Sequence, residues 1–284
     1  MLTWGKRTYI MGIINVTPDS FSGDSILQKD DPIQYAVEKA RQFIADGADI
    51  LDIGAESSRP GSHPISAEEE LERLMPVIRA IKQEDIDAIL SVDTYKSEVA
   101  ESCLEIGADW INDIWGLQMD ALMAKVVART KAPVILMHNR SRSSAIQQSA
   151  GLGASYQADE YDDFFRELLI DLEALAQNAI NAGINSEDII LDPGIGFGKT
   201  ISQNLQIIKH LNQIKALGYP VLIGPSRKSF IGKVLDLPVE ERMEGTAASV
   251  AVGIIHGADI IRVHDVKQMV RIARMTDALI GRTL

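Results

Sequence analysis

Short apolar runs alternate with longer amphipathic segments along the whole chain, and polar or charged residues follow each run directly. Short runs rich in β-branched residues are typical of buried strands. The run at Ile189–Leu191, for example, leads into Asp192 and a glycine-rich turn. Eight such runs predict strands at Tyr9–Ile14, Ile50–Gly54, Ala88–Val92, Trp110–Ile111, Pro133–Met137, Ile189–Leu191, Pro220–Gly224 and Asp259–Ile261.

The segments between these runs have the apolar spacing of helices. At Pro32–Asp46, the residues Ala36, Val37, Ala40 and Phe43 recur at helical intervals and predict one buried face. Several segments end in Gly-Ala-Asp. Glycine just past a helix is favoured because it adopts the left-handed backbone conformation. Further helices are predicted at Ser66–Lys82, Ser97–Ile106, Ala121–Thr130, Asp163–Ala182, Asn204–Leu217, Glu244–His256 and Val266–Ile280.

Eight alternations of strand and helix predict an α/β protein that folds as a single (β/α)8 TIM barrel. The alternative, an open doubly wound sheet, requires no eightfold count and usually carries a dinucleotide fingerprint. A length of 284 residues suits one barrel, and no linker-like segment divides the chain. We therefore expect one domain over residues 1–284, with residues 1–8 as a possible cap over the bottom of the barrel.

Composition excludes several classes of protein. A formal net charge of −12 disfavours non-specific binding to nucleic acid or to an anionic membrane. Cys103 is the only cysteine, which excludes a disulfide framework and a cysteine-based metal site. The sequence shows neither a signal-peptide pattern nor an apolar run that could span a bilayer. We expect a soluble, cytoplasmic protein whose partners are small molecules.

The polar residues that follow the strands form two chemically different groups. In a barrel these strand ends meet at one mouth. The first group combines two carboxylates, an amide and an ammonium, which suits a planar heterocycle with donors and acceptors along one edge, such as a pterin. Alternatively, these side chains pair with one another across the barrel. This group consists of Asp93, Asn112, Asp192 and Lys228.

The second group suits a phosphate. Arginine and histidine bind phosphate oxygens, and the loops after the last two strands are the usual phosphate position in this fold. Asn15 adds an amide oxygen that could also bind Mg2+. For Arg262 the alternative is a salt bridge to Asp265 or Asp259. The group consists of Asn15, Arg59, Arg262 and His264, with hydroxyls from Ser57 and Ser58.

Taken in order, seven motifs of this chain resemble those of the dihydropteroate synthases. One glycine-rich turn alone would be weak evidence, but an ordered set on separate loops over nearly the whole chain is specific. The motifs are Asn15–Ser22, Asp52–Gly61, Ser91–Thr94, Asn112–Ile114, Asp192–Lys199, Ser226–Ser229 and Arg262–Asp265.

The resemblance implies an enzyme that condenses 6-hydroxymethyl-7,8-dihydropterin diphosphate with 4-aminobenzoate in folate biosynthesis. It implies that Asp93, Asn112, Asp192 and Lys228 bind the pterin, and that Asp93, Lys228, Arg262 and His264 are catalytic. It also implies Mg2+ at Asn15, competition by sulfonamides, and a homodimer formed through helices near the end of the barrel, such as Met243–Ile255. The diphosphate would be bound by Asn15, Ser58, Arg59, Arg262 and His264, and the aminobenzoate by Phe21, Pro60, Phe197 and Ser229.

The chain departs from the family pattern in three places. Phe21 is followed by Ser22-Gly23-Asp24-Ser25, where the family usually has Ser-Asp-Gly-Gly, and Ala55 and Ser58 replace a common glycine and threonine. The segment Asn139–Asp162 matches the family pattern poorly, and no role is predicted for it.

The sequence is also compatible with two other functions. One is a barrel that transfers a methyl group from methyltetrahydrofolate to a corrinoid, and the other is a pterin-binding paralogue without activity.

Overall fold

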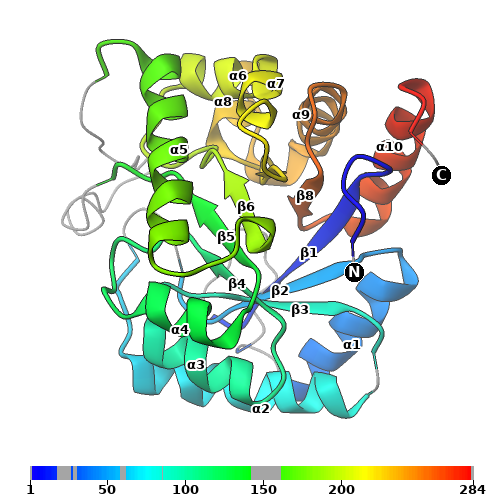
Figure 1. Ribbon diagram of the computed structural model, residues 1–284. Coiled ribbons are helices and arrows are strands. Elements are labelled where there is room, and N and C mark those ends of the chain that lie inside the picture. Colours follow the sequence, from blue (N-terminus) through cyan, green and yellow to red (C-terminus); the bar gives the residue numbers. More distant parts are fainter. Residues whose placement is uncertain are drawn as a thin grey trace.

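The described residues of the chain form a closed parallel barrel. The computed structural model describes residues 2–17, 27, 31–57, 62–84, 86–141 and 161–282. Within them, eight parallel strands form one sheet in the order β6-β5-β4-β3-β2-β1-β8-β7. A bridge between Leu191 and Val221 joins the two ends of this sheet, and helices surround it (Figure 1). The predicted (β/α)8 barrel is confirmed, and the open doubly wound sheet is excluded.

Each predicted apolar run contains a strand. The hydrogen-bonded strands differ from the runs at their ends, because polar residues such as Asn15, Asp93 and Asp192 continue the pairing after the apolar residues stop. The strands are β1 (Tyr9–Asn15), β2 (Ile50–Gly54), β3 (Ile89–Asp93), β4 (Trp110–Asp113), β5 (Val134–Met137), β6 (Ile189–Asp192), β7 (Leu222–Ile223) and β8 (Ile260–Val263).

The helices begin at the caps that the sequence supplies. The Ser66 side chain accepts a hydrogen bond from the backbone of Glu69, and Thr200 and Gln203 form a reciprocal capping box. The helices are α1 (Pro32–Ala45), α2 (Ala67–Gln83), α3 (Ser97–Glu105), α4 (Met123–Thr130), α5 (Phe164–Asn181), α6 (Ile201–Lys209), α7 (Leu211–Lys215), α8 (Ser229–Leu235), α9 (Met243–Ile255) and α10 (Val266–Leu279), with 3-10 turns at Ser186–Asp188 and Val239–Glu241.

One helix prediction was wrong in detail, and one helix was not predicted. The helix expected over Asn204–Leu217 begins earlier and is interrupted at His210, which ends α6 and precedes α7. Helix α8 was not predicted at all. It has seven residues, too few for a helical period to emerge from the sequence, and it starts directly after Lys228. It is therefore an additional element at the mouth of the barrel after β7, where this fold often carries a short extra helix.

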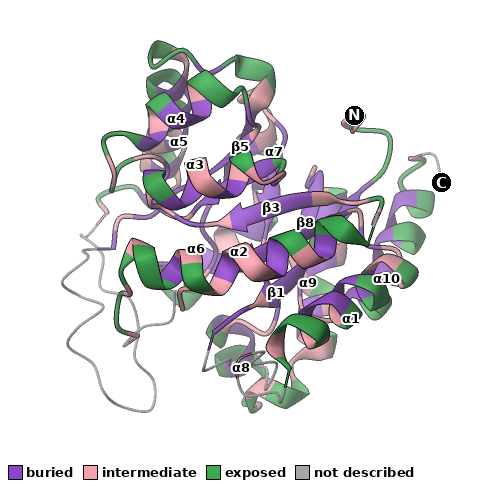
Figure 2. Ribbon diagram, turned by 90° about the horizontal axis from the view of Figure 1, so that it is seen from below, coloured by how far each residue is buried: buried purple, intermediate pink, exposed green. Residues whose placement is uncertain are grey.

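The core consists of two separate apolar clusters. The larger cluster fills the space between the strands and the helices, so the buried faces of the helices turn towards the barrel (Figure 2). The smaller cluster fills the lower interior of the barrel, and Leu2 and Trp4 of the N-terminal segment pack against it. Its buried members are Tyr9, Met11, Ile50, Trp110, Ile135, Ile190, Leu222 and Ile260.

This inner cluster determines which polar side chains face the barrel mouth. Side chains two positions apart along a strand point to the same face. The residues two positions beyond Ile50, Trp110, Ile190 and Ile260 therefore also point inwards, in the layer above the apolar cluster. These residues are Asp52, Asn112, Asp192 and Arg262.

The helices show no membrane-spanning candidate. Among the described residues, no helix combines the length and apolar composition that crossing a bilayer requires.

Candidate active site

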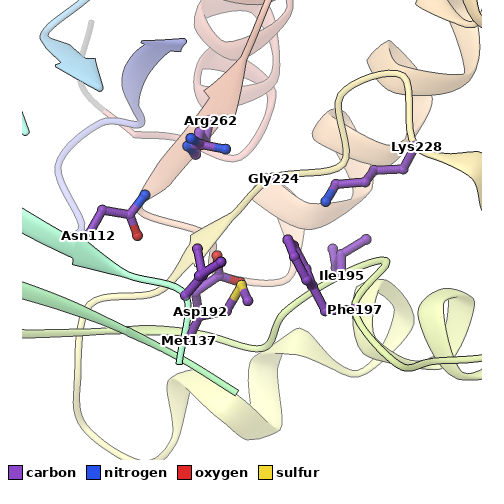
Figure 3. Close-up of a pocket in the computed structure, with 9 residues that line it drawn as sticks. Asn112, Met137, Asp192, Ile195, Phe197, Gly224, Lys228 and Arg262 are labelled. Atoms are coloured by element: carbon purple, nitrogen blue, oxygen red, sulfur yellow. The ribbon is translucent and has the colours of Figure 1, made fainter. Parts of the chain in front are cut away.

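A pocket opens at the carboxyl ends of the strands. Charged, polar and apolar side chains together line it, which is the usual composition of a small-molecule site. In Figure 3, the side chains of Asn112, Asp192, Lys228 and Arg262 converge on it from different strands and loops. Apolar side chains and one glycine complete its wall: Ile114, Met137, Ile195, Phe197 and Gly224. The structure thus brings together residues of both predicted groups.

A buried ion-pair network supports one side of this pocket. Arg262 Nε donates to Asp52 Oδ2 at 2.6 Å, and Arg262 Nη2 donates to Asp93 Oδ2 at 2.6 Å. Asp52 is fully buried and also accepts hydrogen bonds from Asn112 Nδ2 at 3.0 Å and Ser91 Oγ at 2.6 Å. Two carboxylates thereby fix the plane of one guanidinium, and Arg262 Nη1 has no hydrogen bond to the described residues.

The alternative pairing of Arg262 was therefore wrong. Asp265 instead accepts hydrogen bonds from Arg227 at 2.6 and 2.9 Å, and Asp259 accepts one from Lys215 at 2.6 Å. Both aspartates lie outside β8, three positions before and after Arg262. Asp52 was not assigned to either group. Its signal was present in the sequence as a carboxylate two positions after Ile50, on the inner face of a buried strand.

Burial and charge shift the pKa values of Lys228 and Arg262, which line the pocket, and of Asp93, which pairs with Arg262. Burial raises the pKa of Asp93 to about 7, against the opposing effect of Arg262. Burial and, to a lesser extent, the positive charge of Arg262 lower the pKa of Lys228 to about 8. Burial also lowers the pKa of Arg262, but Asp52 and Asp93 more than reverse this, so the net shift is upwards. Groups that titrate near neutral pH at a pocket are typical of functional sites.

The glycine-rich turn after β6 places Phe197 against Lys228. The ammonium of Lys228 lies 4.1 Å from the centre of the Phe197 ring, a cation–π contact that Figure 3 shows at the edge of the pocket. Gly196 adopts a φ of +85°, and a Cβ there would come within 2.9 Å of Lys228 Cδ. A side chain at position 196 would therefore collide with the stem of Lys228. Asp192 at the start of the turn accepts a hydrogen bond from the Gly194 amide at 2.7 Å, and burial raises its pKa.

His264 is held beside the loop after β7. Its Nδ1 lies 3.0 Å from Ser226 Oγ, which also accepts a hydrogen bond from the backbone N–H of His264 at 3.2 Å. This contact fixes the position of the His264 ring beside Ser226. His264 is not part of the pocket wall around Lys228 and Arg262. Ser229, expected at the aminobenzoate, is exposed as the first residue of α8.

Of the remaining predicted site residues, the structure describes Asn15 but not the residues of the first two loops. Asn15 ends β1, is partly exposed, and makes no side-chain hydrogen bond to the described residues. Its amide oxygen could therefore serve Mg2+, which shares its coordination shell with water and phosphate oxygens. Among the described residues no cluster of three histidine, cysteine, aspartate or glutamate side chains could hold a metal. Phe21, Ser58, Arg59 and Pro60, together with the altered first loop at Gly23–Ser25, lie outside the described residues.

Comparison with known proteins agrees with this geometry. Residues 11–264 match the pterin binding enzyme family. A dihydropteroate synthase of Clostridium beijerinckii is 50% identical over 279 residues, which are 98% of this chain and 96% of the relative. The dihydropteroate synthase of Clostridium difficile, solved with pteroic acid, is 44% identical with a TM-score of 0.87 and full coverage of both chains. That of Xanthomonas albilineans, solved with 4-aminobenzoic acid, is 36% identical with a TM-score of 0.85, covering 97% and 94% of the two chains. With its motifs, barrel and pocket in agreement, the chain belongs to the dihydropteroate synthases of the pterin binding enzyme family.

Proposed function

We propose that this chain joins 6-hydroxymethyl-7,8-dihydropterin diphosphate to 4-aminobenzoate and releases 7,8-dihydropteroate and pyrophosphate. The observation that carries the proposal is the convergence of Asn112, Asp192, Lys228 and Arg262 on one pocket. The relatives described above support both substrates, since one was solved with pteroic acid and another with 4-aminobenzoic acid.

The pterin ring would occupy the pocket itself. The Asp192 carboxylate can accept two parallel hydrogen bonds from an amino group and an adjacent ring N–H, and the Lys228 ammonium can donate to the ring carbonyl. Met137, Ile114 and the aliphatic part of Arg262 provide apolar contacts for its faces. Asn112, whose Nδ2 is engaged by Asp52, presents its amide oxygen as a further acceptor.

The diphosphate would lie towards Arg262 and His264. Two of the guanidinium nitrogens of Arg262 are engaged by carboxylates, which leaves Nη1 to donate to an anion. Asn15, Ser58 and Arg59 would complete this site. Mg2+, held by Asn15 and by oxygens of the substrate, would neutralise charge on the leaving diphosphate.

The chemistry requires charge stabilisation at two points. The C–O bond between the exocyclic methylene and the diphosphate breaks, and the resulting cation is delocalised into the electron-rich pterin ring. Asp93 would stabilise that cation, while Arg262 and His264 would stabilise the negative charge on the departing pyrophosphate. Preorganised contacts of this kind are each worth about 2.7–4 kcal/mol of activation barrier.

The second step forms a C–N bond. The amine of 4-aminobenzoate attacks the methylene, and its proton, acidic once the bond has formed, passes to solvent. Phe197 would contact the aromatic ring of this substrate, together with Phe21 and Pro60, and Ser229 at the start of α8 would lie near its carboxylate. A sulfonamide, which has the shape and charge of 4-aminobenzoate, would compete for the same space.

Pyrophosphate release tests this function directly. The purified protein is incubated with the pterin diphosphate and Mg2+, with and without 4-aminobenzoate, and pyrophosphate and dihydropteroate are quantified. Release coupled to dihydropteroate formation and blocked by a sulfonamide supports the synthase. Tight pterin binding without product would indicate a binding protein instead. Methyl transfer from methyltetrahydrofolate to a corrinoid would indicate the methyltransferase.

A homodimer through α9 and α10 is part of the proposal. Helix α9 is apolar around most of its surface, and it packs against α10. Large apolar side chains remain exposed on these helices, namely Val252, Ile255, Met275 and Leu279. Sedimentation of the wild type and of Ile255→Glu would test the dimer. We expect a wild-type dimer that dissociates in the variant, and a monomeric wild type would refute the dimer.

The cytoplasmic location stays a prediction that cell fractionation can check.

A further inference from the structure

The turn that carries Phe197 is tied by an ammonium that does not belong to the pocket wall. Lys199 Nζ donates to three backbone carbonyls, those of Gly194 at 3.0 Å, Phe197 at 3.0 Å and His138 at 3.2 Å. A lysine ammonium has three protons, so these contacts use all of them. Lys199 is therefore not available as a donor to a ligand.

These contacts join two loops of the barrel mouth. Gly194 and Phe197 belong to the turn after β6, whereas His138 follows β5. The approach of the two loops is close, because a Cβ at Gly194 would lie 2.1 Å from the His138 carbonyl oxygen. The Phe197 N–H also donates to the Gly194 carbonyl at 3.1 Å. The Lys199 ammonium therefore links the carbonyls of both loops.

Asn204 fixes the opposite side of the same turn. This residue of α6 is 2% exposed. Its Oδ1 accepts a hydrogen bond from the Gly196 amide at 2.7 Å, and its Nδ2 donates to the carbonyls of Thr200 at 2.8 Å and Lys199 at 3.2 Å. Its amide therefore ties the turn to the first residues of α6.

The position of this turn determines the position of two pocket side chains. The Phe197 ring contacts the Lys228 ammonium at 4.1 Å, and the backbone at Gly196 lies against the Lys228 stem. A small shift of the turn would move both contacts, and misplacement of a binding group by about 1 Å can cost a hundredfold in rate. Lys199 can thus affect a bound ligand through the position of this turn.

We propose that Lys199 is a positioning residue, which holds the turn after β6 so that Phe197 and Lys228 are preorganised for substrate. The inference rests on the proposed function for the identity of that substrate. Burial lowers the pKa of Lys199 to about 7, whereas its three carbonyl partners favour the charged ammonium. Neutral lysine would keep fewer donors for them.

The first test needs no ligand. Hydrogen exchange at the backbone amides of residues 194–199 is compared between the wild type, Lys199→Met and the control Lys209→Met. Lys209 is exposed on α6, the helix that follows the same turn. Exchange should accelerate in Lys199→Met and stay unchanged in the control. Unchanged exchange in Lys199→Met would overturn the proposal whether or not the protein is a synthase.

The second test shows whether the effect reaches substrate through Phe197. Lys199→Met should weaken binding of the pterin diphosphate and raise the KM for 4-aminobenzoate about tenfold, with kcat much less affected. In a Phe197→Leu background the same change should add less than about twofold, because coupled residues are not additive. Fully additive penalties, or unchanged binding despite faster exchange, would overturn the positioning role. A wild type that binds pterin but makes no dihydropteroate would refute the proposed function alone.

Discussion

Arg262 Nε donates a hydrogen bond to Asp52 Oδ2 at 2.6 Å, although the two residues stand 210 positions apart. The contact joins β2 to β8 across the mouth of the barrel, with β1 between them in the sheet. Asp93 on β3 accepts a hydrogen bond from Nη2 of the same guanidinium. The arginine is consequently oriented before any substrate binds, which is the arrangement expected for stabilising a developing negative charge.

Removing Asp52 should destabilise the protein strongly. Asp52→Ala leaves the partly buried Arg262 with one counter-charge and Asn112 without its acceptor. Loss of one partner of a buried ion pair typically costs about 3–5 kcal/mol. Urea denaturation measures this loss. The control is Glu101→Ala, which removes an exposed pair with Arg129 and should cost less than about 1 kcal/mol. Equal losses in both variants would contradict the role of Asp52.

Asp93→Asn should lower turnover far more than it weakens pterin binding. The amide retains an oxygen that can accept from Arg262, but it removes the negative charge that would face the cation formed from the pterin. We expect kcat to fall by about 100- to 1,000-fold, the usual cost of one preorganised electrostatic contact. Steady-state kinetics and direct binding of the pterin diphosphate separate the two effects. A variant with wild-type turnover and normal product would rule out this role.

As the pH rises, the activity should decline at a lower pH than the one at which an ordinary lysine loses its charge. Burial lowers the pKa of Lys228 to about 8, so its charged form prevails below that pH and is lost as the pH rises through it. An unperturbed lysine keeps its charge to about 10.4. The kcat/KM profile, which reports groups of the free enzyme, should therefore show a basic limb near pH 8. Lys228→Met should reduce kcat/KM and abolish that limb; a limb that persists would assign it to another group.

Gly196→Ala should impair binding through crowding of Lys228. The residue combines a φ of +85° with a Cβ position 2.9 Å from Lys228 Cδ. Gly218→Ala is a matched control, because Gly218 has a φ of +93° but open space within 4 Å of its Cβ position. Both variants should lose about 1–2 kcal/mol of stability from backbone strain. Pterin affinity, measured by calorimetry, should fall only in Gly196→Ala, and parallel losses in both would refute the crowding argument.

The periodicity of the sequence determined the architecture. Inner apolar residues such as Ile50, Trp110 and Ile190 stand two positions before Asp52, Asn112 and Asp192, so the alternation along a strand determines which polar side chains face the mouth. The ordered motifs then assigned the chain to its family. Helix α8 escaped prediction because seven residues are too few to show a helical period.

The tertiary structure alone decided which charges meet. In the sequence, Asp265 and Asp259 are the carboxylates closest to Arg262. Closure of the barrel instead places Asp52 and Asp93 against Arg262, and Asp265 pairs with Arg227. Likewise, the sequence shows only that Lys199 ends a glycine-rich motif. The structure shows that its ammonium donates to three backbone carbonyls. Local pattern specifies the element and the face of each residue, but pairing between distant elements depends on strand order and register, which arise only when the barrel closes.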